Sequence, residues 1–477
     1  MMAADEVVFL TVAELAQRIR TRQLSPVELT RLYLDRSRTL GPRFNAYVTL
    51  TEPLALAQAE RAEREIRAGH YRGPLHGIPY AAKDLVAVPG YPTTWGAKPY
   101  AQRVLNQTAA VIEHLEQAGA ILIGKAAMIE LAGGLGYRTP QASFTGAARN
   151  PWNLDRWTCG SSSGSGAVVA AALAGFALGS ETNGSILCPS SSCGISGLRP
   201  TFGRVSRYGA MALAYSMDKL GPMARSAEDL ALILEALAGH DPRDAGSLSP
   251  ARATFRATAV QARLQKPLRM GWLAQPWRAQ NEDVRRAVRT AVELLQRVGA
   301  HVEETDLPPG PWEDVAAVTI GAEAATAFED LIESGHVAEL ADAADRVGGY
   351  VRQQIPAADY LRAQRARRIL QKKMAELFEH YDVLVAPATG MPAPPLHPPE
   401  QRPERQRTER VPGRSSPTTV GNLCGLPGVS VPCGLTSEGL PIGIQFVGPP
   451  LGDDAVLAAA VLYQRHTDWH RRRPPNA

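Results

Sequence analysis

The sequence is poor in cysteine and lysine, and it contains no long hydrophobic run. Its five cysteines are odd in number and show no CxxC spacing, which argues against a disulfide framework or a zinc site and favours a reducing cytoplasm. No stretch of about 18 uncharged apolar residues is present, so we expect no transmembrane helix. The nearest candidate, Ala167 to Gly179, is too short and is rich in alanine and glycine. The start, MMAADEVVFL, is acidic, and we expect no signal peptide there.

The charge balance is also weak. A net charge of +4 over 477 residues is too small to indicate nucleic acid binding. Only seven lysines occur, so a lysine in a special position has few competitors. A hydrophobic content of 45% and a charged content of 21% are typical of a soluble globular protein. The length allows one large α/β domain or two to three smaller ones.

The pattern along the chain divides near residue 70. Residues 1–70 read as helices that pack on the rest. The stretch LSPVELTRLYLDRSR has Ser25 as N-cap, Pro26 in the first turn and Glu28 as capping-box partner. A second amphipathic helix runs from Glu52 and is closed by Gly69.

From about Gly77 strand-like and helix-like segments alternate. They are GIPYAAKDLVAV, TAAVIEHLEQAGA, ILIGKA, LRMGWLA, NEDVRRAVRTAVELLQRVGA and HVEETDL, followed by the strand-like YDVLVAPA, GVSVPCG and PIGIQFVG. The alternation predicts an α/β sheet covered by helices on both faces. No linker divides the chain, so residues 71–477 are expected to form one catalytic domain. The proline- and arginine-rich stretch 391–416 is either a solvated surface loop or a lid at a pocket rim.

Two stretches rich in serine and glycine suggest a nucleophile: CGSSSGSG at 159–166 and SETNGSILCPSSSCG at 180–194. Neither contains a histidine. The first matches GxSxG with Ser162 at its centre, but that motif needs a preceding strand and a later Asp or Glu and His, and RNPWNLDRWT is a poor strand. A P-loop would need a lysine that is absent here. The third reading is a polar loop that caps a helix starting near Ala167.

The second stretch and one lysine favour a catalytic role for the serines over a capping loop. Consecutive backbone N–H groups in the second stretch suit a developing oxyanion; they belong to Thr182, Asn183, Gly184 and Ser185. Lys83 follows a strongly apolar strand in PYAAKDL. Burial that lowers its pKa from about 10.4 to roughly 8 would make it a usable base. A serine–lysine arrangement then needs no histidine.

These motifs together resemble the amidase signature family over nearly the whole chain. PLHGIPYAAKDL is similar to the family's lysine motif, NPWNLDRWTCGSSSGSGAVVAA to its glycine- and serine-rich signature, and GSETNGSILCPSSSCGISGLRPTFGRVSRYG to its nucleophile segment. MDKLGPMARSAEDLALILEALAGHDPRD, GNLCGLPGVSVPCG and LPIGIQFVGPP also match in character. The resemblance implies the amidase signature fold, a single large α/β domain with a central mixed β-sheet covered by helices on both faces.

The family's Ser–Ser–Lys triad carries over to three positions. By the resemblance, Ser185 is the nucleophile, Ser161 takes its proton, and Lys83 receives one from Ser161. An acyl-enzyme on Ser185 is then cleared by water. The resemblance also implies a cis Gly160–Ser161 bond, with Ser162 in a supporting role. The backbone of 182–185 is expected to form the oxyanion hole.

One further stretch lies where the family builds a pocket wall. ELAGGLGYRTP contains the candidate pocket residues Leu135, Gly136 and Tyr137. Packing under the sheet is the alternative for all three. We expect Cys188 and Cys193, close to the nucleophile, to be small core residues.

The nucleophile segment departs from the family's commonest form. Asp-Thr-Gly-Gly-Ser-Ile-Arg is replaced by Glu-Thr-Asn-Gly-Ser-Ile-Leu at 181–187. A similar form with Glu occurs in a branch that includes peptide amidases. The missing Arg at Leu187 weakens the case for a small acidic substrate, and Asn183 is expected to line the pocket.

The resulting hypothesis is a stand-alone hydrolase that cleaves amide, anilide or carbamate C–N bonds. The alternatives are the glutaminase subunit of a tRNA-dependent amidotransferase, a non-catalytic binding protein on the same scaffold, and a Ser-His-Asp esterase. We expect a small-molecule substrate, no cofactor, no metal, no direct nucleic acid or membrane partner, and a monomer or homodimer.

Overall fold

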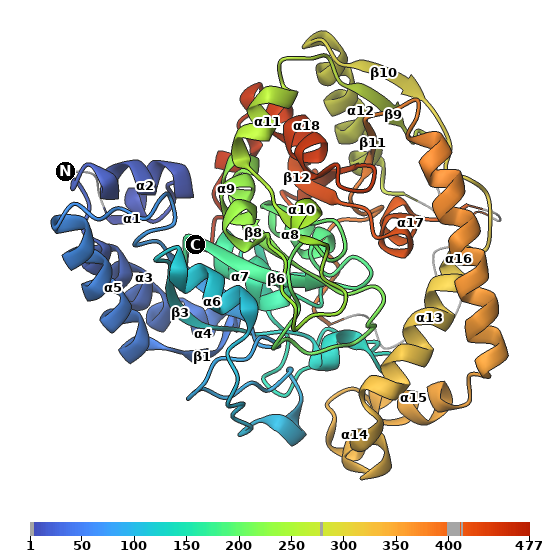
Figure 1. The fold of residues 1–477 in the computed structure, drawn as a ribbon, viewed down its shortest axis with the longest axis horizontal. Helices are drawn as coiled ribbons and strands as arrows, with labels where there is room; N and C mark the ends of the chain where they lie inside the picture. The colour runs from blue at the N-terminus through green and yellow to red at the C-terminus, as the bar shows by residue number, and fades with distance from the viewer. Residues whose placement is uncertain (1–3, 277–279, 398–410, 412–413) are drawn as a thin grey trace.

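A mixed β-sheet lies at the centre of the molecule (Figure 1). The computed structural model describes residues 4–276, 280–397, 411 and 414–477. In these residues an eleven-stranded sheet has the order β1-β3-β2-β6-β8-β7-β12-β13-β11-β9-β10. Its strands are β1 (Tyr47–Leu50), β2 (Pro79–Lys83), β3 (Ile121–Ala126), β6 (Phe176–Glu181), β7 (Ser196–Arg199), β8 (Lys219–Ala224), β9 (Arg269–Trp272), β10 (His301–Glu304), β11 (Val383–Pro387), β12 (Gly428–Leu435) and β13 (Pro441–Val447).

Strand direction changes across the sheet. β2 is parallel to β3 and β6, and β9 is parallel to β10 and β11. The remaining neighbours are antiparallel. The strands β2, β3, β6 and β13 are buried along their whole length. Such strands carry near-continuous apolar runs because both faces are covered.

Helices cover the two faces of this sheet. On one face, four helices pack against one another and the strands: α9 (Ala227–Leu237), α11 (Ala257–Arg263), α12 (Glu282–Arg297) and α18 (Asp453–Arg465). On the other face, α7 (Ser163–Ala170) packs on β6 and β2, and α8 (Leu187–Cys193) packs on β12 and β13. The α/β fold predicted from the sequence, with a central mixed sheet covered by helices on both faces, is confirmed.

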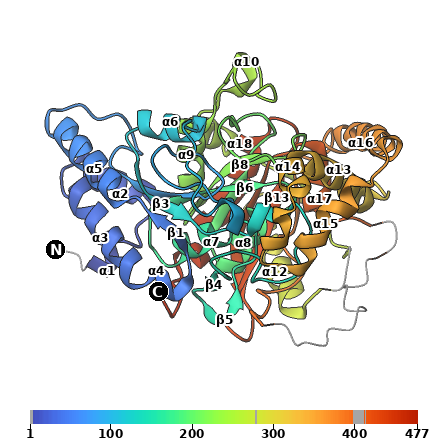
Figure 2. The same ribbon diagram turned by 90° about the horizontal axis from the view of Figure 1, so that it is seen from below.

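Two helical groups flank the sheet at opposite ends, and Figure 2 shows them apart from each other. The chain's first helices lie at one end, in blue: α1 (Ala4–Val7), α2 (Val12–Arg20), α3 (Pro26–Thr39), α4 (Gly41–Phe44) and α5 (Glu52–Arg67). The other group, in gold and orange, comprises α13 (Trp312–Ala327), α14 (Glu329–Glu333), α15 (Ala343–Gln353), α16 (Ala357–Leu377) and α17 (Pro417–Cys424). The remaining short elements are α6 (Ala110–Gln117), α10 (Pro250–Ala253), η1 (Lys98–Tyr100), η2 (Glu130–Gly133), η3 (His336–Glu339) and η5 (Trp469–Arg471).

The N-terminal segment is not wholly helical. α3 starts as predicted, because the Ser25 side chain accepts from the N–H groups of Val27 and Glu28. β1, however, pairs antiparallel with β3 at the edge of the sheet, so the reading of residues 1–70 as helices alone is wrong there. Every residue of β1 is half-buried, so the strand lacks the alternation that would have revealed it.

Two other stretches of the sequence have different outcomes. RNPWNLDRWT, taken as a poor strand, forms a small hairpin of β4 (Arg149–Asn150) and β5 (Asn153–Trp157) outside the main sheet. Within β5 only Asp155 is exposed, Trp157 is buried and the other residues are half-buried. Most of the 391–416 stretch, at 398–410 and 412–413, lies outside the described residues, so its roles as loop or lid stay predictions.

In the described parts of the chain, no helix combines the length and apolar character needed to cross a membrane. The nearest candidate in the sequence, Ala167 to Gly179, is divided between the end of α7 and the beginning of β6. All of its residues are buried.

Candidate functional site

The candidate site is a buried lysine amine surrounded by three serine hydroxyls. Nζ of Lys83 lies 2.7 Å from Oγ of Ser161, 3.0 Å from Oγ of Ser162 and 2.9 Å from Oγ of Ser180. Lys83 ends β2, and Ser180 lies near the end of the parallel neighbour β6. Neighbouring parallel strands bring their carboxyl ends to the same edge of a sheet, where sites commonly form. Ser161 and Ser162 reach this edge from the loop before α7.

The hydrogen bonds of Ser162 assign donor and acceptor roles around the amine. Its hydroxyl donates to the carbonyl of Ser180 at 3.2 Å and accepts from the Ser180 N–H at 3.3 Å. A serine has one hydroxyl proton, so Ser162 accepts from Lys83 rather than donating to it. When the amine is neutral, its lone pair is therefore available to the hydroxyl of Ser161, which lies nearest.

Burial makes Lys83 a base near neutral pH. The side chain is fully buried. This burial lowers the pKa of Lys83 to about 7, although the carboxylates of Asp218 and Glu181 act in the opposite direction. With a pKa near 7, about half of the amine is neutral at pH 7.

Ser185 lies in the turn between β6 and α8, next to the Lys83 cluster. Its carbonyl accepts from the N–H of Ser162 at 3.3 Å, so the two serine loops touch. Its side chain is half-buried. In the described residues, the Ser185 hydroxyl has no hydrogen bond to Ser161, the contact that a proton relay needs. Such contacts are often long in unliganded enzymes and tighten when substrate binds.

The peptide bond between Gly160 and Ser161 is cis, which confirms the expectation from the family resemblance. Gly160 is also sterically required. A Cβ at this position would lie 2.8 Å from Ile129 and 3.0 Å from Trp157.

The turn at 182–185 presents free backbone donors. Among the described residues, the N–H groups of Asn183, Gly184 and Ser185 have no acceptor in the protein. The next two N–H groups, of Ile186 and Leu187, are satisfied, because both donate to Oε2 of Glu181 at 2.8 and 2.9 Å. Gly184 has a φ of +101°, a conformation that favours glycine. The unpaired N–H groups belong to three of the four residues predicted to form the oxyanion hole, Thr182 being the fourth, and that role stays a prediction.

Glu181 connects this turn to the core through hydrogen bonds and an ion pair. Its Oε1 accepts from Arg199 at 2.8 Å and from the amide of Asn422 at 2.9 Å. Burial raises the pKa of Glu181, but Arg199 and the hydrogen bond from Asn422 more than offset this and keep its pKa below the usual range. The carboxylate therefore stays charged and holds the segment after Ser185.

Asp218 and Lys219, at the start of β8, form a second buried group under the turn. Asp218 accepts from the Thr182 hydroxyl at 2.5 Å, and Nζ of Lys219 donates to Oδ1 of Asn422 at 2.5 Å. Burial raises the pKa of Asp218 and lowers the pKa of Lys219. The MDKLGPMAR motif contains both residues but predicts no role for either of them. Their polarity inside an apolar strand was the available signal.

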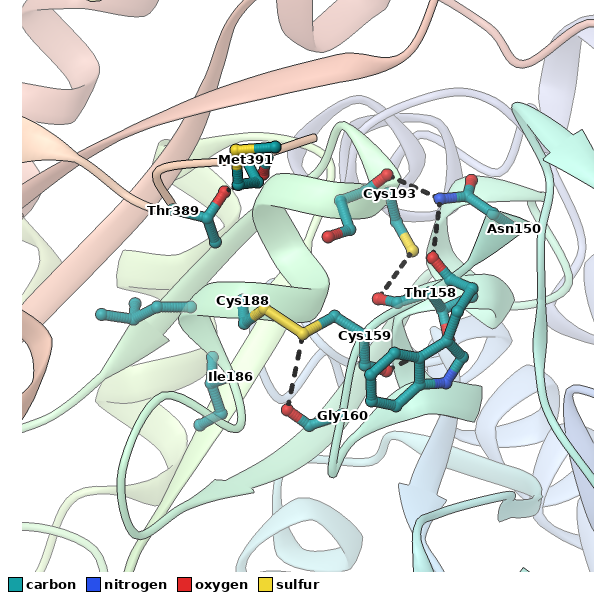
Figure 3. Close-up of a disulfide and its surroundings, with 12 residues drawn as sticks. Asn150, Thr158, Cys159, Gly160, Ile186, Cys188, Cys193, Thr389 and Met391 are labelled. Carbon is teal, nitrogen blue, oxygen red and sulfur yellow. Dashed lines mark hydrogen bonds between the residues drawn. A yellow bond between two sulfur atoms is a disulfide. The ribbon is translucent and has the colours of Figure 1, made fainter. Parts of the chain in front are cut away.

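A disulfide joins Cys159 to Cys188, with the two Cα atoms 6.0 Å apart (Figure 3). The argument against a disulfide framework did not anticipate this single bond, because an odd count and the absence of CxxC cannot detect a pair 29 positions apart. Cys188 is half-buried in this bond and is not a core cysteine. Cys193 is free and buried, as expected.

The three candidate pocket residues lie in three different environments. Leu135 is buried in the main core. Tyr137 packs edge-on against Trp157, with ring centroids 6.2 Å apart, in a small cluster that also contains Ile129 and Cys159. Gly136 lies beside Arg352, whose Nη2 would be 3.2 Å from a Cβ at that position. Only Tyr137 therefore adjoins the serine loop, and its contact with substrate stays a prediction.

In the ranges that the structure describes, no group of three or more His, Cys, Asp or Glu side chains is arranged to hold a metal ion. The polar groups of the site are hydroxyls, one amine and backbone N–H groups. Such groups suit acyl transfer by a serine.

An α/β sheet that buries a lysine among serines at its strand ends defines the class of the protein. A family model described as Amidase matches residues 28–457. The chain belongs to the amidase signature family.

Relatives within the family carry different names. The chain is 36% identical to a glutamyl-tRNA(Gln) amidotransferase subunit of Coxiella burnetii, over 97% of this chain and 99% of that protein. It is 31% identical to the native peptide amidase of Stenotrophomonas maltophilia, with a TM-score of 0.84 and 98% of each chain covered. A structure from a vestigial protein complex, described as revealing the origins of an s-triazine catabolic enzyme, has a TM-score of 0.86 at 31% identity, covering 96% of this chain and 98% of that one. The protein is therefore an amidase signature hydrolase of C–N bonds.

Proposed function

We propose that this protein is a stand-alone hydrolase of amide, anilide or carbamate bonds that works through an acyl-enzyme on Ser185. The observation that carries the proposal is the neutralisable amine of Lys83, 2.7 Å from the hydroxyl of Ser161 in a loop that touches the Ser185 turn. A base with a pKa near the working pH is the most effective proton acceptor.

In the proposed acylation step, the oxygen of Ser185 forms a bond to the carbonyl carbon of the substrate. Its proton passes to Oγ of Ser161, whose own proton passes to Nζ of Lys83. The carbonyl oxygen becomes negative and is stabilised by the N–H groups of 183–185. The same relay then returns the proton to the leaving nitrogen, the C–N bond breaks, and the amine departs.

Deacylation repeats the sequence with water as the nucleophile. Lys83 accepts the proton of water through Ser161, and the oxygen of water attacks the acyl carbon. The tetrahedral intermediate collapses, and the proton returns to Oγ of Ser185. The free acid leaves.

The residues around the turn favour an uncharged substrate. The side chain of Asn183 is exposed beside Ser185, so its amide is available to donate to or accept from a substrate. Leu187 is fully buried against β12, so no cationic group enters the site from that position. We propose Tyr137 as one aromatic wall of the pocket.

The second candidate is the glutaminase subunit of a tRNA-dependent amidotransferase. It is supported by the 36% identity to the amidotransferase protein from Coxiella burnetii. In that role the chain would require partner subunits. Its departures from the commonest nucleophile segment, at 181, 183 and 187, count against it.

The test is the release of ammonia or amine by the purified chain without partners. The substrates are glutamine, aliphatic amides, C-terminal peptide amides, anilides and aryl carbamates. Turnover of a bulky amide or carbamate that is abolished by Ser185→Ala supports the proposal. Turnover of glutamine alone, or only with added amidotransferase partners, overturns it in favour of the second candidate.

A small-molecule substrate and a monomer or homodimer complete the proposal. The cytoplasm stays the proposed compartment. Disulfides in the cytosol are usually transient, catalytic or redox-sensing. A cytoplasmic location therefore predicts that the Cys159–Cys188 bond can be reduced in the folded protein.

A further inference from the structure

The disulfide connects the two loops that carry the proposed catalytic serines. Cys159 lies two positions before Ser161, and Cys188 lies three positions after Ser185. Figure 3 shows the bond joining Cys159, in the loop beside Gly160, to Cys188 in the helix that follows Ile186. It is a covalent bridge across the site, and nothing in the proposed reaction uses its sulfur atoms.

The other contacts between these loops are non-covalent: the Ser162 hydroxyl bonds the backbone of Ser180 at 3.2 and 3.3 Å, and Sγ of Cys193 donates to the carbonyl of Thr158 at 3.8 Å. In the described residues, the backbone bond between them is the long one from the Ser162 N–H to the Ser185 carbonyl, at 3.3 Å. Cys188 is itself attached to the nucleophile turn, because its N–H donates to the carbonyl of Gly184 at 2.9 Å. A displacement of Cys188 is therefore passed to the turn that holds Ser185 and the free N–H groups.

The other end of the bridge is equally close to the chemistry. Cys159 has a φ of +68°, in the left-handed region that favours glycine. Unfavourable backbone conformations persist where the surroundings enforce them, and the disulfide is one such constraint. When the bond opens, Cys159 can relax, and Gly160 and Ser161 follow it directly in the chain.

The bridge can be reached from solvent. Both of its cysteines are half-buried, whereas the free Cys193 and Cys433 are buried. Cys424 is a free cysteine with similar partial exposure. This partial exposure is the basis for treating the folded protein with a soluble thiol, and Cys424 offers a matched control.

We propose that the Cys159–Cys188 disulfide positions the Ser161 loop relative to the Ser185 turn, and that its reduction lowers the rate of acylation. This inference rests on the proposed function. The reductant is a dithiol. One of its thiolates attacks a sulfur of the disulfide and breaks the S–S bond, and its second thiolate then closes on the mixed disulfide. Two electrons and two protons pass to Cys159 and Cys188, and the dithiol becomes a cyclic disulfide.

The experiment compares oxidised and reduced full-length enzyme on one bulky amide. The protein is treated with dithiothreitol without oxygen, the thiols are counted by alkylation and mass spectrometry, and circular dichroism monitors the fold. We expect two additional thiols and an unchanged fold. We also expect a fall of roughly tenfold to a hundredfold in kcat and in the acylation burst rate, because small misplacements of reacting groups have effects of this size. KM is expected to change much less, and re-oxidation restores kcat.

Two variants separate positioning from general damage. Cys159→Gly combined with Cys188→Ser should show the kcat of the reduced enzyme and no response to dithiothreitol. Glycine tolerates the positive φ at 159, so a fall in kcat in this variant reports the missing bridge and not a side chain strained in that conformation. Cys424→Ala should respond to dithiothreitol as the original enzyme does.

The outcomes distinguish this inference from the proposed function. Equal kcat in the oxidised and reduced enzyme overturns the inference and leaves the proposed function standing. Five free thiols in the purified protein that oxidants fail to pair also overturn it. No turnover in either redox state overturns the proposed function.

Discussion

The pH dependence of activity follows from the burial of Lys83. Only the neutral amine can accept a proton from Ser161. Burial lowers the pKa of Lys83 from 10.5 to about 7. The neutral fraction is then about one-tenth at pH 6, about one-half at pH 7 and about nine-tenths at pH 8. An ordinary lysine would be only about 0.3% neutral at pH 8.

We therefore expect kcat/KM to rise with pH through an apparent pKa of about 7 and to level off above about pH 8. The assay is the initial rate on a neutral amide between about pH 5 and pH 9, where the substrate itself does not titrate. A profile that is flat over this range, or that still rises steeply above about pH 9, would refute the assignment of Lys83 as the base.

Variants at Lys83 complete this test. Lys83→Met removes the base, and Lys83→Arg retains a cation that cannot deprotonate. Both are expected to lower kcat/KM by roughly 10²- to 10⁴-fold, the range typical of general base catalysis. If Lys83→Arg kept most of the activity, charge alone would suffice and proton transfer to Lys83 would be excluded.

The same pKa predicts an effect on stability. Because the folded-state pKa of Lys83 lies below its unfolded value, the contribution of Lys83 to the unfolding free energy is greatest above about pH 10.5. This contribution is lost as pH falls toward about 7. The loss amounts to about 5 kcal/mol as an upper estimate. Methionine does not titrate, so Lys83→Met avoids this loss. Its unfolding free energy should exceed that of the original protein by an amount that grows as pH falls from about 10.5 toward 7, which denaturant titrations at several pH values will measure. A gain that does not depend on pH would contradict the calculation.

Three other predictions concern the surrounding structure. Glu181→Gln leaves the buried Arg199 without its ion pair and should lower the unfolding free energy by about 3–5 kcal/mol in guanidinium titrations; a loss under about 1 kcal/mol would show that the pair is dispensable. Reduction of the Cys159–Cys188 bond, whose cysteines are 29 positions apart, should lower the unfolding free energy by about 3.5 kcal/mol through chain entropy, and an unchanged urea midpoint would argue against this. Burial raises the pKa of Asp345 to about 9, so its stabilising contribution is lost as pH rises from about 4 toward 9. Asp345→Asn should therefore raise Tm increasingly over that interval in calorimetry, and a constant difference in Tm would be inconsistent with a buried neutral carboxyl group.

Much of the architecture could be predicted because local signals agreed with the final structure. The cap at Ser25 and the apolar runs before Lys83 and around Ile121 act over a few residues, and each became the expected element. β1 was missed because a short, half-buried edge strand has no clear period. The mixed direction of the strands came from the family resemblance, not from any local pattern.

In the candidate site, too, some residues could be predicted from the sequence and others could not. Lys83 and Ser161, which the family motifs brought together, are hydrogen-bonded in the structure. Ser180, Lys219 and Asn422 were missed as contributors. Asn422 lies in α17, 241 positions after Glu181 in the sequence. Contacts between distant segments are decided by tertiary packing, which a single sequence does not display.

The strand order has a consequence for how the chain acquires its structure during synthesis. β12 and β13 lie between β7 and β11, so the last strands to be made fill the middle of the sheet. Arg199 in β7 pairs with Gly428 in β12, and until β12 has emerged from the ribosome β7 has an unpaired edge. Contacts of such sequence separation form slowly. A ribosome-bound chain that stops before Gly428 is expected to expose the β7 edge to proteases and chaperones, and protection in pulse proteolysis should appear only after Val447 is released.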